Sequence, residues 1–244
     1  MLLLIDAGNT RIKWALAASD AALGQWHASG VALHAELNHL PAQWQGHAVS
    51  AAIVANVAGT RMRDQLQLML PTTDVSWFAS LPALAGIRNG YRRPAQLGCD
   101  RFAALIGARA LAPGQPLVVA TCGTATTVDA VSADGLFSGG MILPGLGLMA
   151  AALASNTAQL PQVTLGSAPP LFADNTNDAI VSGCLSAQAG AIERAFTQSG
   201  AGLCILSGGA APTIAPALAV AHRMVDNIVL VGLQAAANER KPTC

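Results

Sequence analysis

Two segments of this 244-residue chain share one pattern, and that pattern restricts the fold more than any other feature. Residues 2–18, LLLIDAGNTRIKWALAA, contain an apolar run, a polar glycine turn and a second apolar run. Residues 117–131, LVVATCGTATTVDAV, repeat this order. A third strand-like run follows each segment after a short turn, at GQWHASGVAL and at LFSGGMI. Both halves are therefore predicted to begin with three consecutive strands.

Helices and strands are expected to alternate after each of these units. The pattern predicts a strand at 49–57 and helices at 60–70, from Cys99 to Pro113, at 143–156 and at 177–196, then a strand at 203–207 and a closing apolar segment at 227–238. Such alternation in both halves indicates an α/β fold. Proline and glycine in LAPGQP place the domain boundary there, which gives domains 1–115 and 116–244 with a ligand cleft between them.

Composition excludes two classes of function. Hydrophobic residues make up 52% of the chain and charged residues 11%, against about 25% in an average soluble domain. So few charges predict a large core and a buried subunit interface.

Thirteen basic residues balance thirteen acidic ones without clustering, so we expect no nucleic-acid partner. No apolar run approaches the 18 residues of a membrane-spanning helix, so we expect no membrane partner.

The cysteines and histidines carry no recognisable metal or disulfide motif. Five cysteines lie far apart and no export signal precedes them, which predicts reduced thiols and a cytoplasmic location: Cys99, Cys122, Cys184, Cys204 and Cys244. Four of the five histidines fall within residues 27–47 without metal-ligand spacing. We expect these four to be solvated loop or helix residues.

The two glycine turns have the composition of phosphate-binding loops. In DAGNTRIK (6–13) and CGTATTVD (122–129), consecutive backbone amides can face one point and bind phosphate oxygens. Threonine hydroxyls and the cations of Arg11 or Lys13 add donors, and Asp6 could hold Mg²⁺ through water. Each turn alone is more typical of an ordinary hairpin; their equivalent positions in a repeated unit reverse this and favour phosphate binding.

Four segments together resemble type III pantothenate kinases, within the superfamily of actin, sugar kinases and heat-shock ATPases. They are DAGNTRIK, GYRRPAQLGCDRFAALIGA (90–108), CGTATTVDAV with GGMILPGLGLM, and NTNDAIVSG (175–183). LSGGA (206–210) suits a glycine turn on the adenosine side. The resemblance implies two duplicated ribonuclease-H-like domains, ATP with Mg²⁺, phosphorylation of pantothenate at the start of coenzyme A synthesis, and a homodimer.

The resemblance also implies roles for single positions. Eight consecutive residues would form the first phosphate loop and bind ATP: Asp6, Ala7, Gly8, Asn9, Thr10, Arg11, Ile12 and Lys13. Thr124 would contact ATP from the second loop. The pantothenate-binding positions would be Tyr91, Gly98, Cys99, Asp100, Arg101 and, across the dimer interface, Thr176. Asp100 would be the proton acceptor.

Phosphoryl transfer to an alcohol needs a carboxylate within hydrogen-bond reach of the hydroxyl, which agrees with this role for Asp100. A helix beginning near Asp100 would keep its carboxylate ionised. The plainer alternatives remain an N-cap for Asp100, a surface position for Arg101 and a half-buried aromatic role for Tyr91. Whether Asp129 contacts a metal or only ends a strand stays open.

Two positions depart from the family pattern. Thr121 replaces an aspartate that is associated with a bound monovalent cation, so we expect weak or absent dependence on K⁺ or NH₄⁺. Cys99 replaces an alanine and adds an oxidisable thiol. Two competing functions follow: a regulator of gene expression on the same fold, which Thr121 would suit, and a phosphatase or a kinase for another alcohol. The presence of Asp6, Lys13, Tyr91, Asp100 and Arg101 favours the pantothenate kinase.

Overall fold

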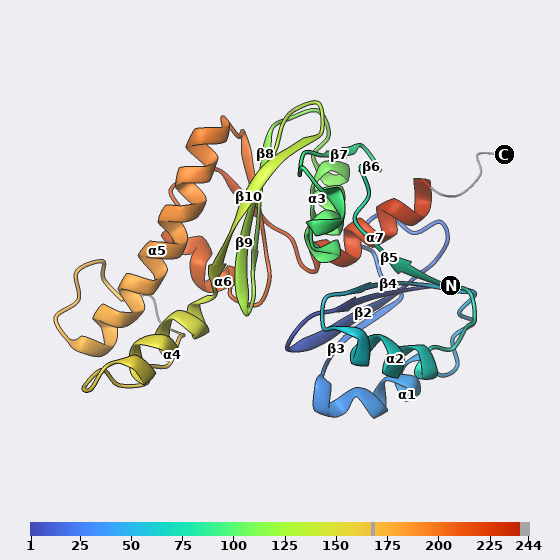
Figure 1. The fold of residues 1–244 in the computed structure, drawn as a ribbon, viewed down its shortest axis with the longest axis horizontal. Coiled ribbons are helices and arrows are strands. Elements are labelled where there is room, and N and C mark those ends of the chain that lie inside the picture. The colour runs from blue at the N-terminus through green and yellow to red at the C-terminus, as the bar shows by residue number, and fades with distance from the viewer. Residues whose placement is uncertain (167–168, 240–244) are drawn as a thin grey trace. The chain divides into compact units, whose positions relative to one another are not determined.

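A computed structural model of the chain describes residues 1–166 and 169–239. The chain forms two compact units (Figure 1). The first contains Met1–Pro113 and the chain from Asn227 onward, and the second contains Gly114–Asp226. Four cysteines are free thiols in the described residues, as expected, and Cys244 lies outside those residues.

The first unit is built on a five-stranded sheet with the order β3-β2-β1-β4-β5. The strands are β1 (Leu2–Ala7), β2 (Arg11–Ala17), β3 (Ala28–Leu33), β4 (Ala51–Asn56) and β5 (Val75–Phe78). β1, β2 and β3 are antiparallel neighbours, whereas β1, β4 and β5 run parallel. The turn predicted after residue 18 and the strand predicted at 49–57 are both present.

Side chains alternate across this sheet and meet a different layer on each face. On one face Leu3, Ile5 and Trp14 pack with residues of η1 (His34–His39), α1 (Leu40–Trp44) and α2 (Thr60–Met69). On the other face lie α3 (Cys99–Leu111) and α7 (Ile228–Glu239), which contact each other and the strands. Asp6 and Lys13 alternate with the first set, so they belong to the second face.

Short elements precede α3. β6 (Ala83–Leu84) and β7 (Ile87–Asn89) form an antiparallel pair, and η2 (Pro94–Gln96) follows. Phe78 of β5 stacks on Phe102 of α3 with ring centroids 6.0 Å apart. This contact fixes the first turns of α3 against the sheet.

The second unit repeats the topology of the first. Its strands β8 (Leu117–Cys122), β9 (Ala125–Val131), β10 (Leu136–Pro144), β11 (Leu203–Ser207) and β12 (His222–Met224) lie in the order β12-β11-β8-β9-β10. As in the first unit, β8, β9 and β10 are antiparallel and β8, β11 and β12 are parallel. The duplicated strand pattern in the sequence is confirmed, and so is the α/β fold class with two ribonuclease-H-like sheets.

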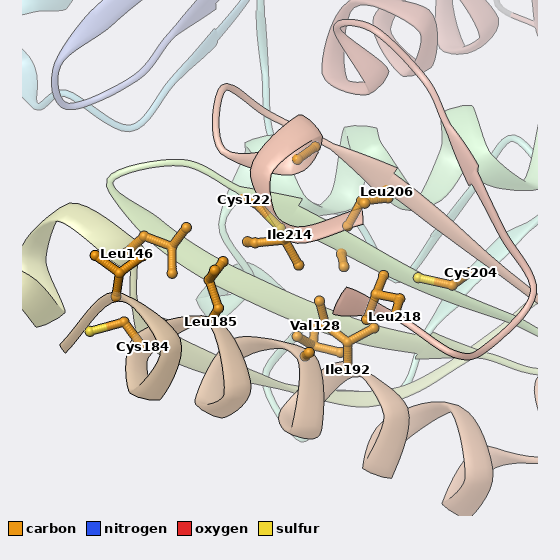
Figure 2. Packing of buried hydrophobic residues seen from close by; sticks show 14 of the residues in the cluster. Cys122, Val128, Leu146, Cys184, Leu185, Ile192, Cys204, Leu206, Ile214 and Leu218 are labelled. Atoms are coloured by element: carbon orange, nitrogen blue, oxygen red, sulfur yellow. The ribbon is translucent and has the colours of Figure 1, made fainter. Parts of the chain in front are cut away.

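One face of the second sheet is covered by helices. They are α4 (Leu146–Asn156), α5 (Thr176–Ser199) and α6 (Ala211–Ile214), and the short η3 (Ala215–Ala217) follows α6. Figure 2 shows Ile192 of α5 next to Val128 of β9 within the apolar core. Asn175 caps α5 because its side chain accepts a hydrogen bond from the amide of Asp178 at 3.0 Å.

The closing segment of the chain joins the first unit. Within the segment 227–238, residues 228–238 are helical and belong to α7, and α7 packs on α3 through glycines. A Cβ added at Gly107 of α3 would lie 2.7 Å from the carbonyl oxygen of Ile228, and one at Gly232 of α7 would overlap the carbonyl of Ala103. A domain boundary between residues 115 and 116 would assign α7 to the second domain, away from α3. The compact units instead place α7 with α3, because the two helices pack together.

None of the helices in the described part of the chain combines the length and the apolarity needed to cross a membrane.

We predict that Gly232→Ala lowers the free energy of unfolding by about 1–3 kcal/mol, because the new methyl group must push the two helix backbones apart. Urea unfolding of both proteins measures the difference. Gly147→Ala in α4 is the matched control, since a Cβ there meets no atom within 4 Å. The control should stay within about 1 kcal/mol of the wild type. Equal stability of Gly232→Ala and the wild type would contradict the helix contact described here.

Candidate active site

The first glycine turn is a tight hairpin between β1 and β2. Ala7 pairs with Ile12, and the amide of Gly8 donates to the carbonyl of Arg11 at 3.1 Å. Asn9 and Thr10 form the exposed tip. The hairpin alternative raised by the sequence is therefore correct as geometry, and it is compatible with phosphate binding because the two residues of the tip are exposed.

Asp6 and Lys13 are cross-strand partners at the base of this hairpin. Burial raises the pKa of Asp6 to about 7, Lys13 opposes this shift, and the charge of Asp100 adds to it. The carboxyl group of Asp6 is therefore protonated in part near neutral pH in the free protein. A cation bound beside it would favour the ionised form.

Asp100 lies in the first turn of α3, and Gly98 is the N-cap residue. The N-cap alternative for Asp100 is therefore wrong, although its Oδ1 accepts the amide of Arg101 at 2.8 Å. Burial raises the pKa of Asp100, while the Arg101 amide and guanidinium act against that rise. Desolvation is the largest of these effects, and the expectation that the Asp100 carboxylate stays ionised remains a prediction. A raised pKa makes this carboxylate a stronger base.

Arg101 and Tyr91 form a pair next to Asp100. The Arg101 guanidinium donates to the Tyr91 hydroxyl at 3.1 Å and lies 5.7 Å from the ring centroid. Arg101 is only 6% exposed, so the surface alternative is wrong. The amide of Tyr91 donates to Asn89 Oδ1 at 3.1 Å, which fixes the backbone at the aromatic residue.

Cys99 links α3 to the end of β4. Its thiol lies 3.6 Å from the carbonyl oxygen of Asn56, and burial beside Asp100 and Asp6 raises its pKa to about 11. The reactive thiolate is therefore scarce at neutral pH, which makes this thiol slow to oxidise. The side chain of Asn56 accepts from the amide of Ala58 and donates to Gly59, so it shapes the loop that follows β4.

The second glycine turn closes in the same way as the first. The amide of Gly123 donates to the carbonyl of Ala125 at 3.0 Å, with Thr124 at the exposed tip. The Thr124 carbonyl accepts the amide of Gly145 at 2.9 Å. A Cβ at Gly145 would overlap Gly123 and Thr124, and one at Gly208 would overlap Cys122. The hairpin is thus enclosed by Gly145 and by Gly208, which lies in the LSGGA turn.

Thr121 is the second-to-last residue of β8, just before the second hairpin turn. It pairs with Thr127 on one side and Ser207 on the other, so three hydroxyl residues occupy adjacent strands. Asp129 is 2% exposed, in the middle of β9. Thr176 is the exposed first residue of α5.

The first unit brings most of the predicted site residues together. Asp6, Lys13 and the start of α3 interact electrostatically, and Tyr91 joins through Arg101. Thr124 and Thr176 belong to the second unit. The described residues contain no cluster of three or more histidine, cysteine or acidic side chains suited to a metal ion.

Sequence inspection missed one histidine at this site. His34 Nε2 lies 2.9 Å from the carbonyl oxygen of Gly8, in the first hairpin. No motif spacing relates these positions, because the contact depends on where β3 ends.

A family model described as type III pantothenate kinase matches residues 2–198. The chain belongs to the type III pantothenate kinase family. It is 55% identical to a protein of that name from Herminiimonas arsenicoxydans and 54% identical to one from Janthinobacterium sp. (strain Marseille), each over the full length of both chains.

Among solved structures, this chain is similar to the activator of the 2-hydroxyisocaproyl-CoA dehydratase from Clostridium difficile, solved with bound ADPNP. The TM-score is 0.54 at 12% identity, covering 98% of this chain and 93% of that one. At this identity the likeness shows the fold alone.

We predict that Gly98→Ala lowers kcat at least tenfold, because a Cβ at this position would lie 2.6 Å from Asp100 Oδ1 and displace the carboxylate. The backbone of Gly98 (φ −53°, ψ 135°) suits alanine, so stability should change by less than about 1 kcal/mol. Steady-state kinetics and thermal unfolding measure the two effects.

A double-mutant cycle provides the control for this prediction. In an Asp100→Asn background the further change Gly98→Ala should cost little, because the group that it displaces no longer acts as a base. Full additivity of the two losses would contradict a shared cause.

Proposed function

We propose that this chain transfers the γ-phosphoryl group of ATP to the primary hydroxyl of pantothenate, forming 4′-phosphopantothenate for coenzyme A synthesis. Membership of the type III pantothenate kinase family supports this activity. The observation that carries the mechanism is the desolvated carboxylate of Asp100, located at the start of α3 in the same unit as the Asp6–Lys13 hairpin.

Asp100 acts as the proton acceptor. Its carboxylate takes the proton of the pantothenate hydroxyl as the oxygen attacks phosphorus, and its raised pKa strengthens it for this purpose. The remaining pantothenate-binding residues are Tyr91, Gly98, Cys99, Arg101 and Thr176. Arg101, already oriented by Tyr91, can bind the pantothenate carboxylate with two parallel hydrogen bonds.

Residues 6–13 bind the phosphates of ATP, and Thr124 adds a contact from the second hairpin. The donor set suits this role, because the backbone amide of the exposed residue Asn9 and the Lys13 ammonium both favour anions. The Asp6 carboxylate offers the oxygen ligand that Mg²⁺ prefers, through water. Mg²⁺ would supply charge neutralisation at the phosphate oxygens; Lys13 and the hairpin amides hold those oxygens in place.

The monovalent cation is weakly bound or absent. The Thr121 row offers only neutral hydroxyl oxygens from Thr127 and Ser207, whereas a carboxylate would attract K⁺ by charge. Asp129, which is buried in mid-strand, is assigned no metal role.

A homodimer is proposed, with Thr176 reaching the pantothenate of the other subunit. Exposed apolar side chains close to Thr176 support an interface there: Leu171 is 66% exposed and Phe172 is 91% exposed. A cytoplasmic location is proposed on the free thiols and on the use of ATP. We propose no nucleic-acid partner, because the basic and acidic residues balance. This balance also counts against the gene-regulator alternative.

The experiment that tests this function follows ADP formation with and without pantothenate and determines the mass of the product. Pantothenate-dependent ADP and a product heavier by one phosphoryl group support the proposal. ATP hydrolysis at a rate independent of pantothenate would refute the proposal and favour the phosphatase hypothesis. Transfer to a different alcohol would refute it and favour a kinase for that alcohol.

We predict that Asp100→Asn reduces kcat by at least about a hundredfold, because an amide cannot accept the hydroxyl proton. Asp64→Asn is the control, since Asp64 is an exposed acid on α2 and should leave kcat unchanged. Steady-state kinetics at saturating ATP and pantothenate measure both. A kcat for Asp100→Asn within fivefold of the wild type would exclude Asp100 as the base.

We predict that replacing K⁺ and NH₄⁺ by tetramethylammonium changes the rate less than twofold, because Thr121 contributes no charge to a cation site. Thr121→Asp should introduce activation by K⁺, and Thr121→Asn should not. A wild-type rate that collapses without these cations would contradict this prediction. Both results come from initial rates at constant ionic strength.

A further inference from the structure

His34 makes a contact with the first phosphate hairpin that none of the assigned roles uses. It is the first residue of η1 and is partly buried. Its Nε2 lies 2.9 Å from the carbonyl oxygen of Gly8, which is 26 residues earlier in the chain. A carbonyl can only accept, so the His34 ring donates this hydrogen bond.

The His34 backbone is held in place from both sides. Before it, Leu33 pairs with Arg11, the residue at which β2 begins. The amide of Leu33 also donates to Glu36 Oε2 at 2.9 Å, which closes the first turn of η1. After it, Leu37 is 4% exposed and packs in the core of the first unit. The ring is therefore presented to Gly8 by a fixed corner of the chain.

This hydrogen bond restricts one peptide group of the hairpin. The carbonyl of Gly8 and the amide of Asn9 belong to the same planar trans peptide, so they point in opposite directions. A ring that holds the carbonyl on its own side thus directs the Asn9 amide to the other side. The amide of Gly8 is already bonded to Arg11, which leaves Asn9 as the first tip residue whose amide direction His34 sets.

We propose that His34 is a positioning residue for ATP: by holding the Gly8 carbonyl, it orients the Asn9 amide toward the nucleotide phosphates. This inference rests on the proposed assignment of residues 6–13 to ATP. The ligand class is a nucleoside polyphosphate, and pantothenate does not depend on the contact. His34 touches neither reacting group and acts only through the hairpin.

Three variants separate the hydrogen bond from the bulk of the ring. His34→Ala removes both, His34→Phe keeps a ring without a donor, and His34→Gln keeps a donor. We expect His34→Ala and His34→Phe to raise the KM for ATP about three- to tenfold, as loss of one hydrogen bond does. The KM for pantothenate and kcat at saturating ATP should change less than twofold. His34→Gln should recover at least half of the loss.

His39→Phe is the matched control, because His39 is an exposed residue of the same short helix and should leave all three parameters unchanged. Equal losses for ATP and pantothenate, or recovery by phenylalanine but not by glutamine, would show a merely structural role and overturn the inference. An unchanged KM for ATP in His34→Ala would also overturn it.

Lys13→Met distinguishes failure of the inference from failure of the loop assignment. If Lys13→Met raises the KM for ATP but His34→Ala does not, only the role of His34 is refuted. If neither variant changes the KM for ATP, residues 6–13 do not bind its phosphates, and both the assignment and the inference fall.

Discussion

The close contact between α3 and α7 determines where the Asp100 carboxylate, the proposed proton acceptor, lies. Gly107 and Gly232 have no Cβ, so the two helix backbones approach to a distance that any other residue would prevent. Both helices then cover the sheet face that carries Asp6 and Lys13. Because α3 begins at Cys99, this packing places Asp100 among groups that remove it from water.

Burial is the source of the chemistry at this site. It raises the pKa of Asp6, Cys99 and Asp100 together, and the charge of Asp100 raises the pKa of Asp6 and of Cys99 further. Lys13 and Arg101 compensate in part, each from a neighbouring position in the fold. A carboxylate in such surroundings is a better proton acceptor than one in water, and it binds a cationic or proton-bearing ligand more readily.

Local patterns predicted much of this structure. The two hairpins, the repeated strand order and the start of α3 at Cys99 all follow from apolar runs, glycines and prolines close together in sequence. Three features could not be predicted. The place of α7 depends on glycine contacts between distant segments, the raised pKa of Asp100 depends on burial, and the His34–Gly8 contact depends on where β3 ends.

The pKa of Asp100 in the free protein tests the account most directly. Titration of its side-chain carboxyl by ¹³C NMR, with Asp100→Asn to assign the signal, measures this value. We predict a pKa above the ordinary aspartate value of about 3.9, because desolvation outweighs the amide and guanidinium of Arg101. A value at or below 3.9 would show that the carboxylate is not desolvated and would contradict its role as a strengthened base.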